Sequence, residues 1–193
     1  MATMARKQVL AEAFGAGDAR LGQALLVAGG IATLALAAKI RVPMWPVPMT
    51  LQTLAVLLIG TTYGARLALV TLLGYVALGA AGLAVFAGDS AGLAYMAGPT
   101  GGYLVGFVAA AGLMGLMARR GLDRRRAGMA AMMLAGSATI YALGLGWMAV
   151  LFGADRGLAW VLQYGMLNFL AGDLVKLAIA ALVVPGLWKF LHR

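Results

Sequence analysis

The sequence predicts an all-α polytopic membrane protein, a bundle of about six transmembrane helices with both termini on the cytoplasmic side (N-in/C-in). Three observations support this. The chain has 193 residues and is 63% hydrophobic but only 11% charged, against about 25% charged residues in soluble domains. Its apolar residues occur in long runs, most of them near the roughly 20 residues that cross a bilayer. Its cationic residues lie mostly between these runs and on one side, as the positive-inside rule requires.

The net charge of +9 does not indicate a nucleic-acid partner, because nucleic-acid binding needs basic residues on a solvated face. Here Lys39, Arg41 and Arg156 fall on the outer side of the expected spans, and Lys176 falls within a span. The other cations fall on the cytoplasmic side: Arg6, Lys7, Arg20, Arg66, Arg119, Arg120, Arg124, Arg125, Arg126, Lys189 and Arg193. We expect membrane lipids, including anionic headgroups near the 119–126 cluster, as the surroundings.

Residues 1–20 are expected to form a short polar cytoplasmic segment, and residues 21–193 the membrane domain. The first twenty residues carry several charges and no apolar core, so no cleavable signal is expected. The first span is predicted at residues 21–38. It carries Ala24, Ala28 and Ala32 at every fourth position, a flat strip suited to another membrane protein or to a neighbouring helix.

A stiff external loop is predicted at residues 42–49, because its three prolines remove amide donors and prevent regular helix. The second span, residues 50–63, is short for a full crossing. It begins with the polar residues Thr50, Gln52 and Thr53. Irregular or polar backbone at membrane depth is tolerated where it faces protein or a cavity. This end is therefore expected to face a cavity.

A cytoplasmic turn at residues 64–66 leads to a third span that ends at Ala81. Residues 82–97 form an external connection too apolar for a solvated loop, and we expect it to pack down as a lid. The remaining spans are expected at residues 98–119, 127–151 and 158–191, the last as one long helix, with a cytoplasmic loop at 119–126 and an external turn at 155–156.

Asp173 and Lys176 are the acid and the amine that lie deep within an apolar run. At a spacing of i, i+3 they share a helix face. A charge at membrane depth costs several kcal/mol unless it is paired or hydrated, so such a pair indicates a functional site. The alternative is an ion pair that only neutralises itself.

Small residues surround this pair and open space for a pocket. Gly165, Phe169 and Gly172 lie along nearly one stripe with Lys176. Tyr164 and Asn168 occupy an adjacent face at i, i+4, where a pocket or a helix-to-helix hydrogen bond could use them.

Enzyme signatures are missing from the sequence. The chain has one histidine, so no H-E-x-x-H zinc motif is possible, and it lacks a P-loop and a nucleophile elbow. It has no cysteine, so disulfides and thiolate metal sites are impossible. We expect no catalytic residues, no metal and no cofactor, and any energised transport must use a separate ATPase. A membrane-embedded enzyme that uses Asp173 with Lys176, and a purely structural bundle, remain as alternatives.

Three segments in order resemble the BioY family, the biotin-specific substrate-binding S components of energy-coupling factor (ECF) transporters. They are Val42 to Leu58 with the run Pro46-Val47-Pro48-Met49-Thr50-Leu51-Gln52-Thr53, then 82–88 followed by Gly98-Pro99-Thr100-Gly101-Gly102-Tyr103, and Gly172-Asp173-Leu174-Val175-Lys176. The sequence departs from the family pattern at Ala84, where proline is usual, and at Asp89-Ser90, where glycines are usual.

The resemblance implies a six-helix bundle in the bacterial inner membrane, with a biotin site near its outer face. It implies that Asp173 accepts from the ureido N–H groups of biotin, that Lys176 donates to a ligand oxygen, and that Gln52, Thr50 and Phe86 help to line the cavity. Phe169, Tyr164 and Asn168 complete the expected substrate-binding set.

It also implies that the Ala24, Ala28, Ala32 strip contacts a transmembrane coupling (T) subunit, which works with ATP-binding subunits. A homo-oligomer is expected if the chain works alone. The nearest alternative is an S component for another vitamin, since fold does not fix the substrate.

Overall fold

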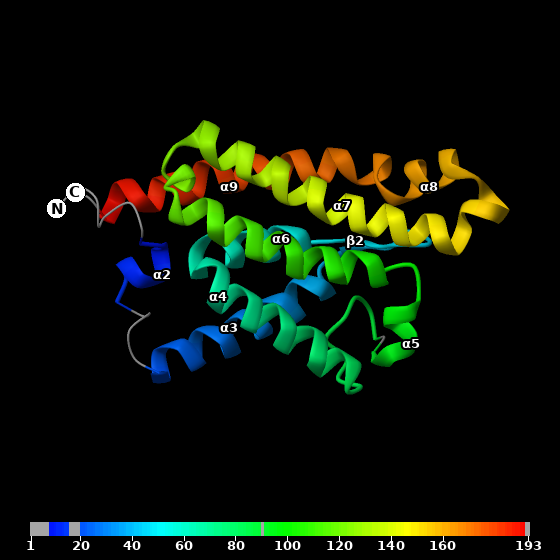
Figure 1. Cartoon of the computed structure of the whole chain (residues 1–193), viewed down its shortest axis with the longest axis horizontal. Coiled ribbons are helices and arrows are strands. Elements are labelled where there is room, and N and C mark those ends of the chain that lie inside the picture. The colour runs from blue at the N-terminus through cyan, green and yellow to red at the C-terminus, as the bar shows by residue number, and fades with distance from the viewer. Residues whose placement is uncertain (1–7, 16–19, 90, 192–193) are drawn as a thin grey trace.

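The computed structural model describes residues 8–15, 20–89 and 91–191. Figure 1 shows α6 between a group formed by α3 and α4 and a group formed by α7, α8 and α9. In chain order the elements are α2 (Leu10–Ala13), α3 (Arg20–Lys39), β1 (Arg41–Val42), β2 (Met49–Thr50), α4 (Gln52–Ala80), α5 (Gly92–Ala97), α6 (Gly101–Arg119), the 3-10 helix η1 (Leu122–Arg124), α7 (Arg126–Arg156), α8 (Leu158–Gly165), the 3-10 helix η2 (Leu167–Phe169) and α9 (Leu170–Leu191).

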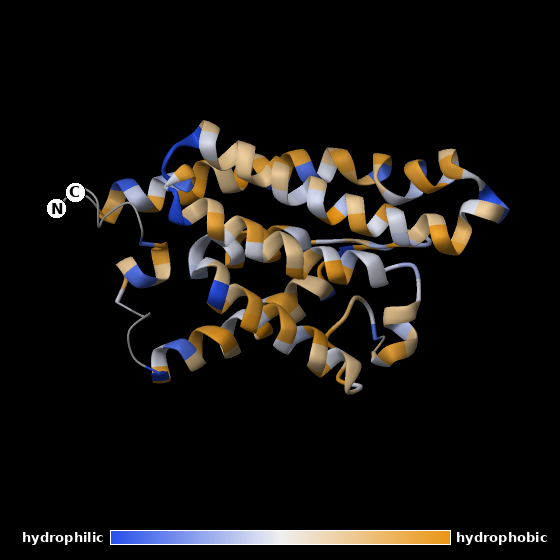
Figure 2. Cartoon of the chain, viewed as in Figure 1, coloured by the Kyte–Doolittle hydropathy of each residue, from blue (hydrophilic) through white to orange (hydrophobic). Residues whose placement is uncertain are grey.

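Five helical stretches of the described chain are long and apolar enough to cross a membrane. Large apolar side chains such as Leu25, Val105 and Val150 stay exposed on their outer faces. Figure 2 shows that hydrophobic residues cover the long helices and that the hydrophilic ones gather mainly at their ends. The chain is therefore a helical membrane protein of several spans, as predicted. The five stretches are Arg20–Lys39, Gln52–Ala80, Gly101–Arg119, Arg126–Arg156 and Leu158–Leu191.

The helix α4 reverses direction at Gly64. This glycine has φ 76° and ψ 165°, which is far from helical geometry. Gln52 Nε2 donates to the Tyr75 hydroxyl at 2.7 Å, whereas a straight helix would separate these residues by about 35 Å. The reversal lies within the turn predicted at residues 64–66. Since the segment before Gly64 is short for a bilayer of about 30 Å, the count of six spans and the orientation of both termini stay predictions.

Glycines bring α6 close to α4. A Cβ atom added at Gly115 would lie 2.1 Å from the backbone nitrogen of Ala65, and one added at Gly60 would lie 2.7 Å from the carbonyl oxygen of Ala111. Such contacts are possible only where one partner lacks a side chain, as is common between membrane helices. The close α4–α6 contact therefore fixes the position of α6 relative to α4, and with it the relative positions of the residues that these two helices carry at their ends.

The last span has its predicted limits, but the prediction of one continuous helix is wrong. The backbone leaves helical geometry at Met166, with φ −140° and ψ −57°, and the chain passes through η2 before α9 begins at Leu170. The Phe169 N–H donates to the Met166 carbonyl at 2.9 Å and not to the Gly165 carbonyl, as it would in a regular helix. The Gly165 carbonyl instead accepts a hydrogen bond from the Tyr103 hydroxyl at 2.7 Å. Helix α6 thus supplies the partner that satisfies the broken backbone.

The connection at residues 82–97 packs onto the bundle, as expected for an apolar segment, but part of it is helical. Residues 92–97 form α5, and the side chain of Phe86 is fully buried. Lys39 Nζ donates to the carbonyl oxygens of Ala84 at 2.7 Å and Phe86 at 3.1 Å, and also to that of Gly88. Of the second departure from the family pattern, Asp89-Ser90, Asp89 is exposed and Ser90 lies outside the described residues.

Part of the N-terminal segment, which the sequence predicted to be polar, is buried against the bundle. Val9 and Leu10 are buried in the core, and Glu12 forms an ion pair with Arg119 at 2.7 Å. Residues 1–7 and 16–19 lie outside the described part of the chain, as do His192 and Arg193. The domain boundary after residue 20 stays a prediction.

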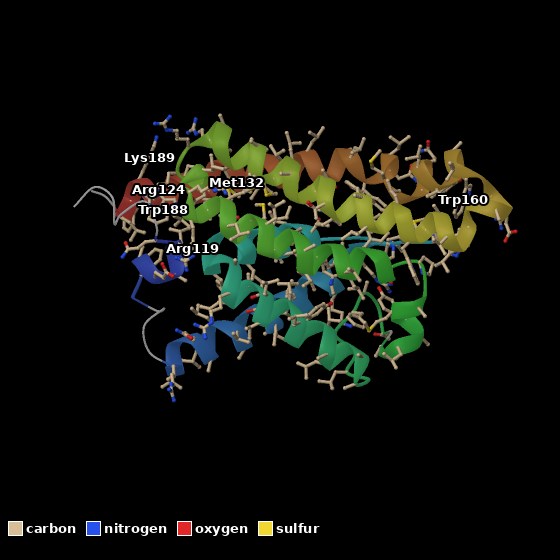
Figure 3. The ribbon with its side chains drawn as sticks, viewed as in Figure 1. Arg119, Arg124, Met132, Trp160, Trp188 and Lys189 are labelled. Atoms are coloured by element: carbon tan, nitrogen blue, oxygen red, sulfur yellow. The ribbon has the colours of Figure 1, made fainter. Side chains whose placement is uncertain are left out.

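Polar and aromatic side chains close the predicted cytoplasmic end. Trp188 Nε1 donates to Asp123 Oδ2 at 2.6 Å, and the Arg124 guanidinium lies 4.4 Å from the centroid of the Trp188 ring. Burial raises the pKa of the Asp123 carboxyl above its usual range, which the Trp188 hydrogen bond partly opposes. Figure 3 shows Arg119, Arg124, Trp188 and Lys189 together at this end, with Trp160 at the other.

Candidate ligand-binding site

A cavity, which we call the inner cavity, opens at the end of α6 opposite Arg119. Several segments meet at this cavity. They are the loop before α4, the first turns of α4, α6 and α9, and the middle of α7. This is the predicted outer end. Its lining residues are Val47, Pro48, Met49, Thr50, Gln52, Thr53, Ala87, Tyr95, Thr100, Tyr103, Leu104, Phe107, Ile140, Tyr141, Phe169, Asp173 and Lys176.

Asp173 and Lys176 form the charged centre of this cavity. Lys176 Nζ lies 3.0 Å from Asp173 Oδ1, and the two side chains are 10% and 15% exposed, lysine first. Lys176 Nζ also donates to Thr53 Oγ1 at 2.7 Å, and the Tyr141 hydroxyl donates to Asp173 Oδ2. Helices α4 and α7 therefore both contribute a partner to a pair carried by α9.

The network leaves hydrogen-bonding capacity unused. An ionised carboxylate can accept about four hydrogen bonds, and an ammonium group can donate three. Asp173 accepts two bonds from protein groups and Lys176 donates two. Acceptor and donor capacity thus remains side by side on a lining that is otherwise largely apolar, which suits a ligand that both donates and accepts.

The break in the last span explains the position of the carboxylate. Because α9 begins at Leu170, Asp173 lies in its first turn, with Lys176 one turn further on the same face. The N-terminal end of a helix carries a partial positive charge that stabilises an anion. A helix that starts at membrane depth is a common way to build a polar site in a bilayer.

Gln52 and Thr50 form a second polar wall. The Gln52 side chain is almost fully buried, and its Oε1 accepts from the Thr50 hydroxyl at 3.3 Å while its Nε2 donates to Tyr75. The Tyr75 hydroxyl in turn donates to the Val85 carbonyl at 2.8 Å. This chain of bonds links the inner cavity to the 82–97 connection.

The structure brings most of the predicted site residues together. Asp173, Lys176, Gln52, Thr50 and Phe169 all line the inner cavity. Whether they bind a ligand stays a prediction, but their convergence from two segments far apart in the sequence, Thr50–Gln52 and Phe169–Lys176, supports it.

Phe86 lies behind the cavity and is not part of its lining. Its ring stacks on Tyr95 at a centroid distance of 5.0 Å and meets Tyr75 edge-on at 5.6 Å. A Cβ atom at Gly79 would lie 2.1 Å from the ring, so this glycine makes the room for it. Phe86 therefore supports Tyr95, which does line the cavity.

Tyr164 and Asn168 lie away from the cavity. The Tyr164 ring packs on Trp160 with centroids 4.9 Å apart, and Asn168 Oδ1 accepts from Gln163 Nε2 at 2.7 Å. The sequence placed them near Asp173 by assuming one unbroken helix. The break at Met166 changes the direction of both side chains, and nothing in the geometry supports their role in binding.

Sequence reasoning missed several lining residues, most of all Tyr141. Tyr141 is a hydroxyl-bearing ring in the middle of the apolar run 127–151, and a polar group at that depth is a usable signal. Tyr103, within the predicted span 98–119, offered the same signal, whereas Leu104 and Phe107 offered none, because aromatic and aliphatic residues occur throughout the spans.

The fold and the site define a class: a helical membrane protein whose helices enclose a largely apolar cavity with a charged pair at its centre. The BioY family model matches residues 7–193. The "Probable biotin transporter BioY" of Pyrococcus horikoshii is 39% identical over 162 residues, 84% of this chain and 93% of that protein. The "Biotin transporter BioY" of Thermotoga maritima is 37% identical over 166 residues, 85% of this chain and 95% of that protein. The chain therefore belongs to the BioY family.

A solved structure shares the fold. The crystal structure of the S-component for biotin from an ECF-type ABC transporter superposes with a TM-score of 0.76 and covers 88% of this chain and 92% of that one. The sequence identity is 22%, so this similarity concerns the fold alone.

Proposed function

We propose that this chain is the biotin-binding subunit of an ECF-type vitamin transporter, which captures biotin at the outer end of the bundle and carries it across the membrane. Its BioY relatives bear the name of biotin transporters. Membership in a transporter family excludes the membrane-embedded enzyme considered above. The observation that carries the proposed site is the shielded Asp173–Lys176 pair with unused hydrogen-bonding capacity.

The chemistry of biotin fits the inner cavity. Its ureido group presents two N–H donors on one side and a carbonyl acceptor on the other. Asp173 accepts from the N–H groups, and Lys176 donates its remaining N–H to a ligand oxygen. The apolar ring system packs against the aromatic and aliphatic wall that includes Phe107, Leu104 and Phe169.

The exposed strip of α3 supports a partner in the membrane. Ala24, Ala28 and Ala32 all face outward from the bundle, so no helix among the described residues covers them. A small-residue strip allows close approach of another helix. We assign this strip to the transmembrane coupling subunit, with ATP-binding subunits as the energy source, in the bacterial inner membrane. In the absence of these subunits, a second copy of the chain is the expected occupant.

Equilibrium binding of labelled biotin to the detergent-purified chain tests the proposal. Asp173→Asn keeps the size of the side chain but removes its charge and one acceptor. Since an unpaired buried hydrogen-bonding group costs about 1–3 kcal/mol, biotin affinity is expected to fall about 10-fold to 100-fold. An analogue that lacks the ureido group should bind the wild-type chain equally poorly.

Asp155→Asn is the matched control, because Asp155 is exposed at the end of α7 and lies outside the inner cavity. Its affinity for biotin should equal that of the wild type. Normal biotin affinity in Asp173→Asn would contradict the assigned site. A folded wild-type chain that binds another vitamin and not biotin would contradict the substrate.

A further inference from the structure

A second cavity, which we call the outer vestibule, adjoins the inner cavity. Four residues line both: Pro48, Ala87, Tyr95 and Thr100. The two spaces are therefore neighbours across a shared rim, with the proline-rich loop on one side and the 82–100 segment on the other. The other residues of the outer vestibule are Arg41, Pro43, Met44, Pro46, Ala94, Gly98 and Pro99.

Arg41 is the one charged residue among those that line the outer vestibule. It lies in β1, directly opposite Thr50 in the β1–β2 pairing. Side chains directly opposite in an antiparallel pair lie on the same face, so Arg41 is next to a residue of the inner cavity. On the other side its guanidinium lies against Gly88, where an added Cβ atom would be 2.9 Å from Nη1. Arg41 therefore reaches from β1 to the facing loop.

No acidic residue of the described chain forms an ion pair with Arg41. The described residues form two ion pairs, Glu12–Arg119 and Asp173–Lys176, and Arg41 is in neither. Asp89 follows Gly88 in the sequence, yet it is not within ion-pair distance of Arg41.

The neighbouring cation is not available for a ligand. Lys39 Nζ donates to three backbone carbonyls, which uses every N–H that an ammonium group has. The charges of Asp173 and Lys176 cancel. The residues that line the two cavities therefore carry one net positive charge, which is that of Arg41. This arrangement is complementary to a ligand with a single negative charge.

We propose that Arg41 binds the carboxylate of the ligand at the rim of the site. The inference rests on the proposed function: biotin carries its carboxylate at the end of an aliphatic chain, remote from the ureido ring. With the ring at Asp173 and Lys176, the chain passes the shared rim and its carboxylate enters the outer vestibule. A guanidinium group can hold a carboxylate through two parallel N–H bonds.

The test compares biotin with its methyl ester, which has the same ring system and chain but no negative charge. The wild-type chain should bind biotin about tenfold more tightly than the ester, as expected for a charge-assisted bond in a partly exposed site. Arg41→Gln should lose this preference and keep its affinity for the ester. Arg41→Lys should retain part of the preference, since it keeps the charge without the planar fork.

Arg156→Gln is the matched control, because Arg156 is an exposed arginine at the same predicted outer end and lies outside both cavities. It should preserve the preference for biotin. Equal affinity of the wild type for both ligands would overturn the role of Arg41 and leave the proposed function intact. An equal loss of both ligands in Arg41→Gln would show that Arg41 only supports the loop, which also overturns it. If the folded wild type binds neither ligand, both proposals fail.

Discussion

The Asp173–Lys176 pair is held by side chains from two other helices. Thr53 contacts the amine and Tyr141 contacts the carboxylate, as any buried ion pair requires, but both charged groups keep hydrogen-bonding capacity that no described residue uses. Replacement of such a pair by apolar residues is often neutral or stabilising. The oriented neighbours and the free bonding capacity around this pair are what a binding site requires.

Removal of the Tyr141 hydroxyl tests the importance of this orientation. Tyr141→Phe keeps the ring and removes the donor to Asp173 Oδ2. A hydrogen bond to a charged group contributes about 1.5–3 kcal/mol, and water or ligand will replace part of it. We expect biotin affinity to fall about tenfold, measured by the same equilibrium binding.

Tyr164→Phe is the control for Tyr141→Phe. Tyr164 packs on Trp160 outside the inner cavity, so removal of its hydroxyl should leave biotin affinity unchanged. A loss in Tyr164→Phe comparable to that in Tyr141→Phe would count against the position of the site.

At the level of elements, Lys39 joins the end of α3 to the connection between α4 and α6. One ammonium group holds the backbone at Ala84, Phe86 and Gly88. The same segment carries Ala87, which lines both cavities. The helix that presents the alanine strip is thus tied directly to the wall of the site.

Lys39→Met is expected to loosen this connection. The methionine side chain approximates the length of the lysine but cannot donate to the three carbonyls. Amide hydrogen exchange of residues 82–89, followed by mass spectrometry, should become at least about tenfold faster. Lys189→Met, at the opposite end of the bundle, should leave this exchange unchanged. Unaltered exchange in Lys39→Met would mean that Tyr75 and Phe86 hold the segment without Lys39.

Two features at this scale were not predictable from the sequence. Hydropathy marks where a span begins and ends, and it located the last span at residues 158–191. It carries no information on the break at Met166, where the Gly165 carbonyl finds its partner in the Tyr103 hydroxyl of a helix far away in the sequence. The directions of the Tyr164 and Asn168 side chains follow from that break, so the sequence left open whether they face the cavity or another part of the bundle.

For the whole molecule, the sequence predicted the class of fold and singled out the two charged residues that lie at the centre of the inner cavity. Both predictions rest on free energies that can be assigned to each residue separately: the free energy of transferring its side chain to lipid and the cost of burying its charge. The contribution of Tyr141 depends on how α7 packs against α9, which is a property of the assembled bundle. For the same reason the sequence marked Gly64 as a turn but could not show that Gln52 would meet Tyr75.

Close packing of α4 on α6 should dominate the stability of the bundle. In Gly115→Val the added side chain would collide with the backbone at Ala65, where no rotamer change can relieve it. Overpacking typically costs about 1–3 kcal/mol, and backbone collisions more. We expect a clearly lower thermal unfolding midpoint in detergent.

Gly146→Val is the control for Gly115→Val, because Gly146 is also helical but has no atom within 4 Å of the added Cβ. Its unfolding midpoint should stay close to that of the wild type. Equal midpoints for both variants would contradict the α4–α6 contact.

The bond from Lys176 to Thr53 spans 123 positions of the chain. During synthesis the α4 half of the site therefore enters the membrane long before its counterpart on α9 exists. A nascent or truncated chain that ends before Leu170 lacks both Asp173 and Lys176, and with them the charged centre of the inner cavity. Only the completed bundle can bind, so a vitamin supplied during biogenesis would stabilise finished molecules and ignore unfinished ones.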